Sequence, residues 1–109
     1  MFEIFHYQTA TGVDVFEDWL DGLADAMAVA RITARIDRII YGNFGDHKSV
    51  GAGVHELRID HGPGYRVYYA VATREIVLIL CGGDKRKQAA DIRRAIAMWQ
   101  DYNKRTQKP

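Results

Sequence analysis

The spacing of apolar residues along the chain predicts short strands alternating with amphipathic helices. Aromatic and β-branched side chains alternate with polar ones over residues 2–7, which is typical of a strand. Apolar residues then recur at helical spacing, first over about 14–23 and then over about 25–41. Gly42 and Asn43 supply a left-handed stop after the second helix. Two helices joined by a few residues predict an antiparallel hairpin whose apolar faces must be covered by a sheet.

The second half of the chain predicts three further strands. Residues 44–53 hold three glycines and show no periodicity, so we expect a loop there. Alternation over 54–60 and 65–71, with a turn-forming composition between them, predicts a β-hairpin. A third strand is expected over 75–80, and its residues 76–80 are apolar on both faces, which places this run at the centre of the sheet.

A last helix completes the predicted fold. We expect Gly82 and Gly83 to end the central strand, and Asp84 to cap a helix that runs to about Lys104. The resulting order is β-α-α-β-β-β-α, an α+β fold with a mostly antiparallel sheet. The helical hairpin and the C-terminal helix are expected to pack on one face of this sheet. We expect one domain over 1–109, because the chain shows neither an internal repeat nor a linker.

Composition narrows the class of protein but not its function. Apolar residues make up 48% and charged residues 27% of the 109, which is ordinary for a globular domain and excludes a disordered tail or a fibre. We expect no membrane span and no signal peptide, because no apolar run approaches about 20 residues. A lone Cys81 favours a reducing, cytoplasmic setting. The formal net charge is only +1, so any nucleic-acid role depends on where the cations lie.

The predicted hairpin brings two like charges together. If both strands turn their apolar residues to the core, Arg58 lies opposite Arg66, and Glu56 lies opposite Tyr68. Like charges directly across a ladder are destabilising. Local conflicts of this kind are expected at functional sites.

The start of the last helix carries a second conflict. Lys85, Arg86 and Lys87 occupy its predicted first turn, where the helix dipole already presents positive potential, so each cation costs about 0.3–1 kcal/mol. Such a turn is well suited to an anion, and the two preceding glycines allow a ligand to approach the backbone closely. We therefore expect a concave site for the phosphates of a polyanion. Its expected lining is Arg58, Arg66, Tyr68, Glu56, Lys85 and Lys87, with Lys48 and Arg86 near the rim.

Each of these basic residues also has a simpler interpretation as solvated surface. The stripe formed by Arg31, Arg35 and Arg38 on the second helix is interpreted first as a solvated polar face, with a nucleic-acid contact as the alternative. The four histidines show no metal-ligand spacing, so we expect no metal site. Cys81 is expected to be a packing residue.

Six segments carry a resemblance to a known family. They are residues 35–38 (RIDR), 42–46 (GNFGD), 53–59 (GVHELRI), 62–69 (GPGYRVYY), 80–85 (LCGGDK), and Gln88 with Asp91-Ile92. Together they resemble the phage-type addiction-module killer proteins, a branch of the RelE/ParE (HigB-like) toxin superfamily. The likeness covers nearly the whole chain, and toxins of this superfamily share the predicted element order.

The resemblance implies a toxin neutralised by an antitoxin that often carries a helix-turn-helix DNA-binding domain. RelE-like members cut mRNA in the ribosomal A site without a cofactor or metal. Arg66 and Lys85 would stabilise the charge at the scissile phosphate, and Arg58 would orient the 2′-hydroxyl or contact a flanking phosphate.

The proton acceptor and the target remain open on the sequence alone. Tyr68, Glu56, His61 and Asp91 are all candidates for the general base, and His61 is also a candidate RNA contact in the hairpin turn. ParE-like members share the fold but inhibit DNA gyrase without phosphodiester chemistry. A decayed toxin retained to bind its antitoxin is the third alternative.

Overall fold

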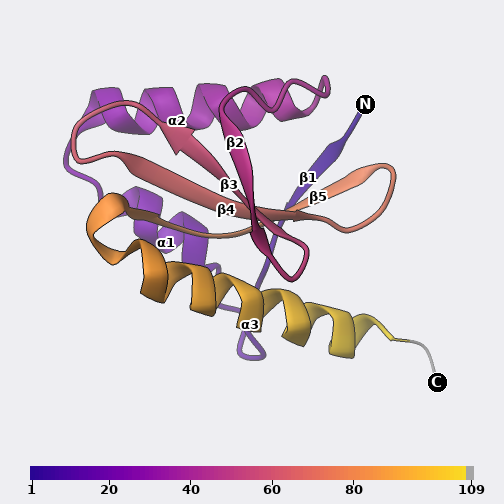
Figure 1. Ribbon diagram of the computed structural model, residues 1–109. Helices are drawn as coiled ribbons and strands as arrows, with labels where there is room; N and C mark the ends of the chain where they lie inside the picture. Colours follow the sequence, from indigo (N-terminus) through magenta and orange to yellow (C-terminus); the bar gives the residue numbers. More distant parts are fainter. Residues whose placement is uncertain (108–109) are drawn as a thin grey trace.

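The computed structural model describes residues 1–107 and confirms the α+β class (Figure 1). The chain adds one strand to the predicted order, giving β-α-α-β-β-β-β-α. The elements are β1 (Glu3–His6), α1 (Val15–Asp21), α2 (Ala26–Ile39), β2 (His47–Gly51), β3 (Val54–Ile59), β4 (Tyr65–Val71), β5 (Ile76–Asp84), the single 3₁₀ turn η1 (Lys85–Lys87) and α3 (Gln88–Thr106).

One five-stranded sheet forms the centre of the molecule, with strand order β1-β5-β4-β3-β2. The strand β1 is parallel to β5, and the remaining neighbours are antiparallel. The strand β5 carries the run that is apolar on both faces, and it lies inside the sheet between β1 and β4, as the pattern predicts.

The prediction of a loop over 44–53 is wrong, because this segment contains β2. His47 pairs with Leu57, and Lys48 pairs with Glu56, so β2 forms an edge strand on β3. Its side chains are mostly exposed, so the strand has no alternating apolar pattern to reveal it. It is stabilised by backbone pairing, and the turn into β3 places Ala52 and Gly53 at positive φ, 54° and 84°.

The prediction that all helices cover one face of the sheet is also wrong. The helices α1 and α2 pack on the face that carries Leu57, Val67 and Tyr69. The helix α3 packs on the opposite face, against Tyr68 and Leu80 among others. Figure 1 shows α2 and α3 on opposite sides of the sheet. The face expected to be open around the hairpin is therefore partly covered by α3.

The central strand does not stop before its two glycines. It continues through Gly82 and Gly83 to Asp84, and neither glycine has a positive φ. At Gly82 the Trp19 ring occupies the place of a Cβ, and at Gly83 the Asp91 carboxylate does so. Both glycines thus make room for side chains of this chain, which corrects the expectation that they let a ligand approach the backbone.

Carboxylate caps begin α1, α2 and the 3₁₀ turn. The Asp14 side chain accepts from the Glu17 backbone N–H, and the Asp25 side chain accepts two backbone N–H groups at the start of α2. Asp84 is predicted to cap the last helix, but it caps η1, a separate turn formed by residues 85–87, and α3 begins after Lys87 without a side-chain cap. No helix within residues 1–107 is long and apolar enough to cross a bilayer.

Candidate functional site

The predicted opposition of two arginines is present in the sheet. Arg58 on β3 pairs with Arg66 on β4, and Glu56 pairs with Tyr68. Arg66 in turn lies opposite Gly83 of β5. Because paired residues of a sheet point to the same face, Arg58 and Arg66 project side by side near the start of α3.

These arginines line a cavity at the end of the sheet formed by the β3–β4 turn. Lys85, the first residue of η1, lines the same cavity, so the three cations that the sequence places together do meet. The cavity has a volume of about 490 Å³ and is lined by Asp46, Arg58, Ile59, Asp60, Gly62, Pro63, Gly64, Arg66 and Lys85. We refer to it as the cationic pocket.

Arg58 is held at one side of the pocket by an ion pair. Its Nη2 lies 2.7 Å from the Asp46 Oδ1, and its Nε donates to the same oxygen at 3.1 Å. Arg35 on α2 fixes the backbone of this corner by donating to the carbonyl oxygens of Arg58, Phe44 and Asp46 at 2.7, 3.1 and 3.0 Å. One helical arginine therefore holds the end of β3 against the segment that leads into β2.

Arg66 lies deeper, with only 13% of its side chain exposed. Its Nη1 donates to the Tyr65 carbonyl at 3.2 Å, and its Nε lies 3.9 Å from the Glu56 Oε2. Within residues 1–107 the buried Nε has no hydrogen-bond partner. Glu56 is itself buried, and Gln88 Nε2 donates to both of its carboxylate oxygens at 2.9 and 3.2 Å. The guanidinium thus sits between a buried carboxylate and the open pocket.

A turn glycine keeps the pocket open next to Arg66. Gly64 has a φ of +81°, and a Cβ placed there would lie 3.4 Å from the Arg66 Nη1 and 3.6 Å from the Lys85 Cβ. A side chain at this position would be strained and would fill the space between the two cations.

The other predicted site residues do not line the pocket. Glu56 and Tyr68 lie beneath α3, because that helix covers the face expected to be open. Lys48 is exposed on β2 opposite Glu56, and Lys87 is exposed at the start of α3. Arg86 forms an ion pair with Asp84, at 3.0 Å.

His61, Asp91 and Cys81 are also placed away from the pocket lining. The His61 Nε2 lies 2.9 Å from the Asp25 Oδ2, which ties the hairpin turn to the start of α2. The Asp91 carboxylate is buried against Gly83 on the face of the sheet that α3 covers. Cys81 is fully buried, and burial raises the pKa of its thiol to about 12, in agreement with a packing role.

The Tyr68 hydroxyl is buried and has no hydrogen-bond partner among residues 1–107. Burial and the nearby Glu56 and Asp91 carboxylates raise the pKa of this phenol well above its usual range. Because a buried hydroxyl without a partner costs free energy, we expect Tyr68→Phe to leave the free energy of unfolding unchanged or to raise it by about 1 kcal/mol. Urea unfolding of the two proteins measures this difference. A loss of more than 1 kcal/mol would show that the hydroxyl makes a stabilising bond.

Asp91 gives a prediction about pH. Burial, the largest cause, raises the pKa of its carboxyl, although Arg94 lies 3.5 Å away. A raised folded-state pKa means that the charged form costs stability at pH values above it, and that this cost disappears as the pH falls below the ordinary carboxyl pKa. We therefore expect Asp91→Asn to be more stable than the wild type at pH 7 and equal to it near pH 3.

A matched carboxylate should behave in the opposite way. Hydrogen bonds from Tyr7 and Arg105 lower the pKa of Asp101, so its stabilising contribution is present at pH 7 and is lost in acid. We expect Asp101→Asn to reduce stability at pH 7. Thermal unfolding measured from pH 3 to 8 compares the two variants, and parallel profiles would contradict the assignment of Asp91 as a buried, disfavoured charge.

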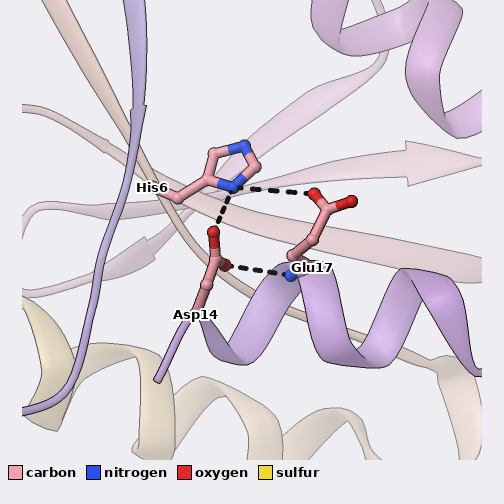
Figure 2. A group of neighbouring side chains, drawn as sticks. All are labelled: His6, Asp14 and Glu17. Carbon is pink, nitrogen blue, oxygen red and sulfur yellow. Dashed lines mark hydrogen bonds and ion pairs between the residues drawn. The ribbon is translucent and has the colours of Figure 1, made fainter. Parts of the chain in front are cut away.

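One histidine lies beside two carboxylates, in a group that the sequence did not predict (Figure 2). The His6 Nδ1 lies 2.7 Å from the Asp14 Oδ2 and 3.9 Å from the Glu17 Oε2. The other Asp14 oxygen accepts from the Glu17 backbone N–H at 3.0 Å. We assign this group to joining β1 to α1, because Asp14 already caps the helix and a cation here would face the positive end of its dipole.

Sequence reasoning missed four residues that shape the pocket or lie beside it. Arg35 belongs to the basic stripe on α2. Helical spacing does not predict that its side chain binds the carbonyl groups of Arg58, Phe44 and Asp46. Asp46 and Asp60 line the pocket, and Gln88 holds Glu56. The resemblance motifs contain Arg35, Asp46 and Gln88, which was the available signal for three of the four.

The fold and the pocket define a small α+β protein with a cationic cavity suited to an anionic ligand. The chain belongs to the family described as "Phage derived protein Gp49-like (DUF891)", whose model matches residues 18–100. It is also similar to an uncharacterized protein of Haemophilus influenzae, with 50% identity over 86 residues. This alignment covers 79% of the present chain and 87% of the relative.

Proposed function

We propose that this protein is the toxin of a type II toxin–antitoxin pair and that it cleaves mRNA on the ribosome. The observation that carries the proposal is the convergence of Arg58, Arg66 and Lys85 in one pocket. Membership of a phage-derived family and the resemblance to RelE-like toxins support the same class of protein. A neutralising antitoxin, with a helix-turn-helix DNA-binding domain, is proposed as the partner on the basis of that resemblance.

The proposed reaction is a transesterification within the RNA strand. The ribose 2′-oxygen attacks the adjacent phosphorus, the bond from phosphorus to the 5′-oxygen breaks, and a 2′,3′-cyclic phosphate and a 5′-hydroxyl result. The proton of the 2′-hydroxyl passes to a base, and the leaving 5′-oxygen takes up a proton. Negative charge gathers on the non-bridging oxygens, where fixed donors stabilise the transition state without reorganising.

The three cations have separate roles in this proposal. Arg66 is fixed by the sheet and by Glu56, so its guanidinium is already in place for the scissile phosphate. Lys85 adds a second positive charge from the start of η1. Arg58, which shares its charge with Asp46, contacts a flanking phosphate or orients the 2′-hydroxyl.

We propose that the proton acceptor is either a carboxylate that lines the pocket or a group of the ribosome. Tyr68 is buried and held neutral, Glu56 is engaged by Gln88, and His61 and Asp91 face other partners. The carboxylates that line the pocket are Asp46 and Asp60. Proton transfer contributes about 10²–10⁴-fold, so a weak base or a group of the ribosome suffices when the strand is well oriented.

Expression without the antitoxin tests the proposal. We expect rapid growth arrest and new 5′ ends, bearing hydroxyl groups, inside translated messages. Intact mRNA together with cleaved chromosomal DNA would instead identify a ParE-like gyrase inhibitor. Normal growth with a folded protein would identify a module that only binds its antitoxin. Either of the last two results overturns the proposed nuclease.

A further inference from the structure

A second basic cavity adjoins the cationic pocket. It has a volume of about 270 Å³ and lies along α2. Ile59 and Asp60 line both cavities, so the two lie next to each other at the end of β3. The lining of this second cavity, which we call the α2 cavity, consists of Arg31, Ala34, Arg35, Arg38, Ile59 and Asp60.

The two cavities together form a tract lined by six of the fifteen lysine and arginine side chains of this protein. Six cationic and two anionic side chains line them, which gives a local formal charge of +4. The whole sequence has a net charge of +1, so the remainder carries −3. The low net charge therefore results from an uneven distribution, with net positive charge gathered in the tract, and positively charged surfaces of this kind attract nucleic acids.

The arginines of the α2 cavity differ in what they can bind. Arg35 is occupied by three backbone carbonyl groups. Arg31 and Arg38 are exposed, and neither forms an ion pair within residues 1–107. They stand seven positions apart on one face of α2, on either side of Arg35, so two charges are available for an external anion.

The lining of the tract favours a polyanion over a protein segment. Protein interfaces are anchored by aromatic or large apolar side chains near their centre. Here the large apolar residue of the lining is Ile59, which is 3% exposed and belongs to the core. The exposed large apolar residues of the described chain, such as Met27, Tyr41 and Phe5, do not line either cavity.

The position of Asp60 favours an extended nucleic-acid strand over a compact anion as the ligand of the tract. It carries a negative charge at the junction of the two cavities, where it repels a phosphate. A compact anion that reached into both cavities would place negative charge next to this carboxylate and be repelled by it. A single strand, whose phosphates are separated by sugars and bases, can place one phosphate in each cavity and a neutral group at Asp60.

We propose that the α2 cavity is a second phosphate subsite for single-stranded RNA, adjoining the cationic pocket. This inference rests on the proposed function, because it assumes that the strand in the first pocket is the substrate. Arg31 and Arg38 bind the backbone at a distance from the scissile phosphate, and they do not contact the reacting atoms.

Binding of uncleavable oligonucleotides of two lengths tests the inference. Fluorescence anisotropy with 2′-O-methyl RNA of two and of eight nucleotides measures affinity without requiring cleavage or the ribosome. We expect the double variant Arg31→Ala, Arg38→Ala to weaken binding of the octamer about tenfold and to leave the dinucleotide unchanged. The slope of log affinity against log salt for the octamer should become shallower by about 1.4, since each single-strand phosphate contact contributes about 0.7.

A matched double variant controls for the loss of charge. Arg74 lies in the β4–β5 turn and Lys104 near the end of α3, and neither lines the two cavities. We expect Arg74→Ala, Lys104→Ala to change octamer binding less than twofold. Equal weakening by both double variants, equal weakening of both lengths, or no weakening would each overturn the inference. Absence of RNA cleavage in cells, with length-dependent binding intact, would count against the nuclease and not against this subsite.

Discussion

Arg66→Ala is expected to abolish growth arrest and to lower the rate of mRNA cleavage by about 10²–10³-fold. The guanidinium is held by the sheet at the floor of the cationic pocket, and removing one fixed donor to transition-state charge costs about this much in other enzymes. Quantified 5′ ends after induction, at equal protein levels, measure the change. Cleavage within twofold of the wild type would contradict the assignment of Arg66.

The folding of this variant must be controlled, because Arg66→Ala leaves Glu56 as a buried charge without its cation. Removing one member of a buried pair typically costs about 3–5 kcal/mol. The double variant Glu56→Gln, Arg66→Gln removes both charges and should be better folded, yet equally inactive. Arg66→Lys keeps a charge and should retain partial activity. An active double variant would show that Arg66 acts only through folding.

Gly82→Ala is expected to cost about 3 kcal/mol of stability, which corresponds to a fall in Tm of roughly 10–20 °C for a domain of this size. The Cβ would overlap the ring of Trp19, and the backbone of Gly82 is held by its pairing with Val67 of β4. Thermal unfolding followed by circular dichroism measures the change.

Gly22→Ala is the matched control. This glycine also has a negative φ, and a Cβ there would lie 3.5 Å from its nearest neighbours, so we expect a change below 0.5 kcal/mol. The double variant Gly82→Ala, Trp19→Leu should recover part of the lost stability, because a smaller side chain vacates the space. Equal stability of the Gly22→Ala and Gly82→Ala proteins would refute this account of the central strand.

The opposition of Arg58 and Arg66 could be predicted because alternation fixes which face each residue of a strand occupies. Once both strands turned their apolar residues inward, the short turn between them selected the register that pairs Arg58 with Arg66, and the structure has that register. The meeting with Lys85 followed from the short path between the central strand and the last helix.

The burial of Glu56 and Tyr68 could not be predicted in the same way. Alternation says that they share a face with the two arginines, but it does not say which helix covers that face. The helix α3 packs over one part of it and leaves the turn end open, so Glu56 is buried while Arg58 remains partly exposed. The division is set by the length and direction of α3, which are tertiary properties.

Two further errors have physical causes that the local sequence does not reveal. The strand β2 is an exposed edge strand held by backbone hydrogen bonds, so its side chains carry no periodic signal. The glycines at 82 and 83 were interpreted as a break, because a glycine that makes room for a distant ring or carboxylate has the same local sequence as one that ends a strand.

The most direct test of the central claim is NMR of the arginine side chains during titration with an uncleavable RNA trinucleotide. The ¹⁵Nε signals of Arg58 and Arg66 are expected to shift together as the 2′-O-methyl trinucleotide binds, while the signal of Arg74 at the opposite end of β4 stays unchanged. Shifts confined to Arg74 and other residues outside the pocket, with Arg58 and Arg66 unaffected, would contradict the claim that this pocket binds the phosphates of RNA.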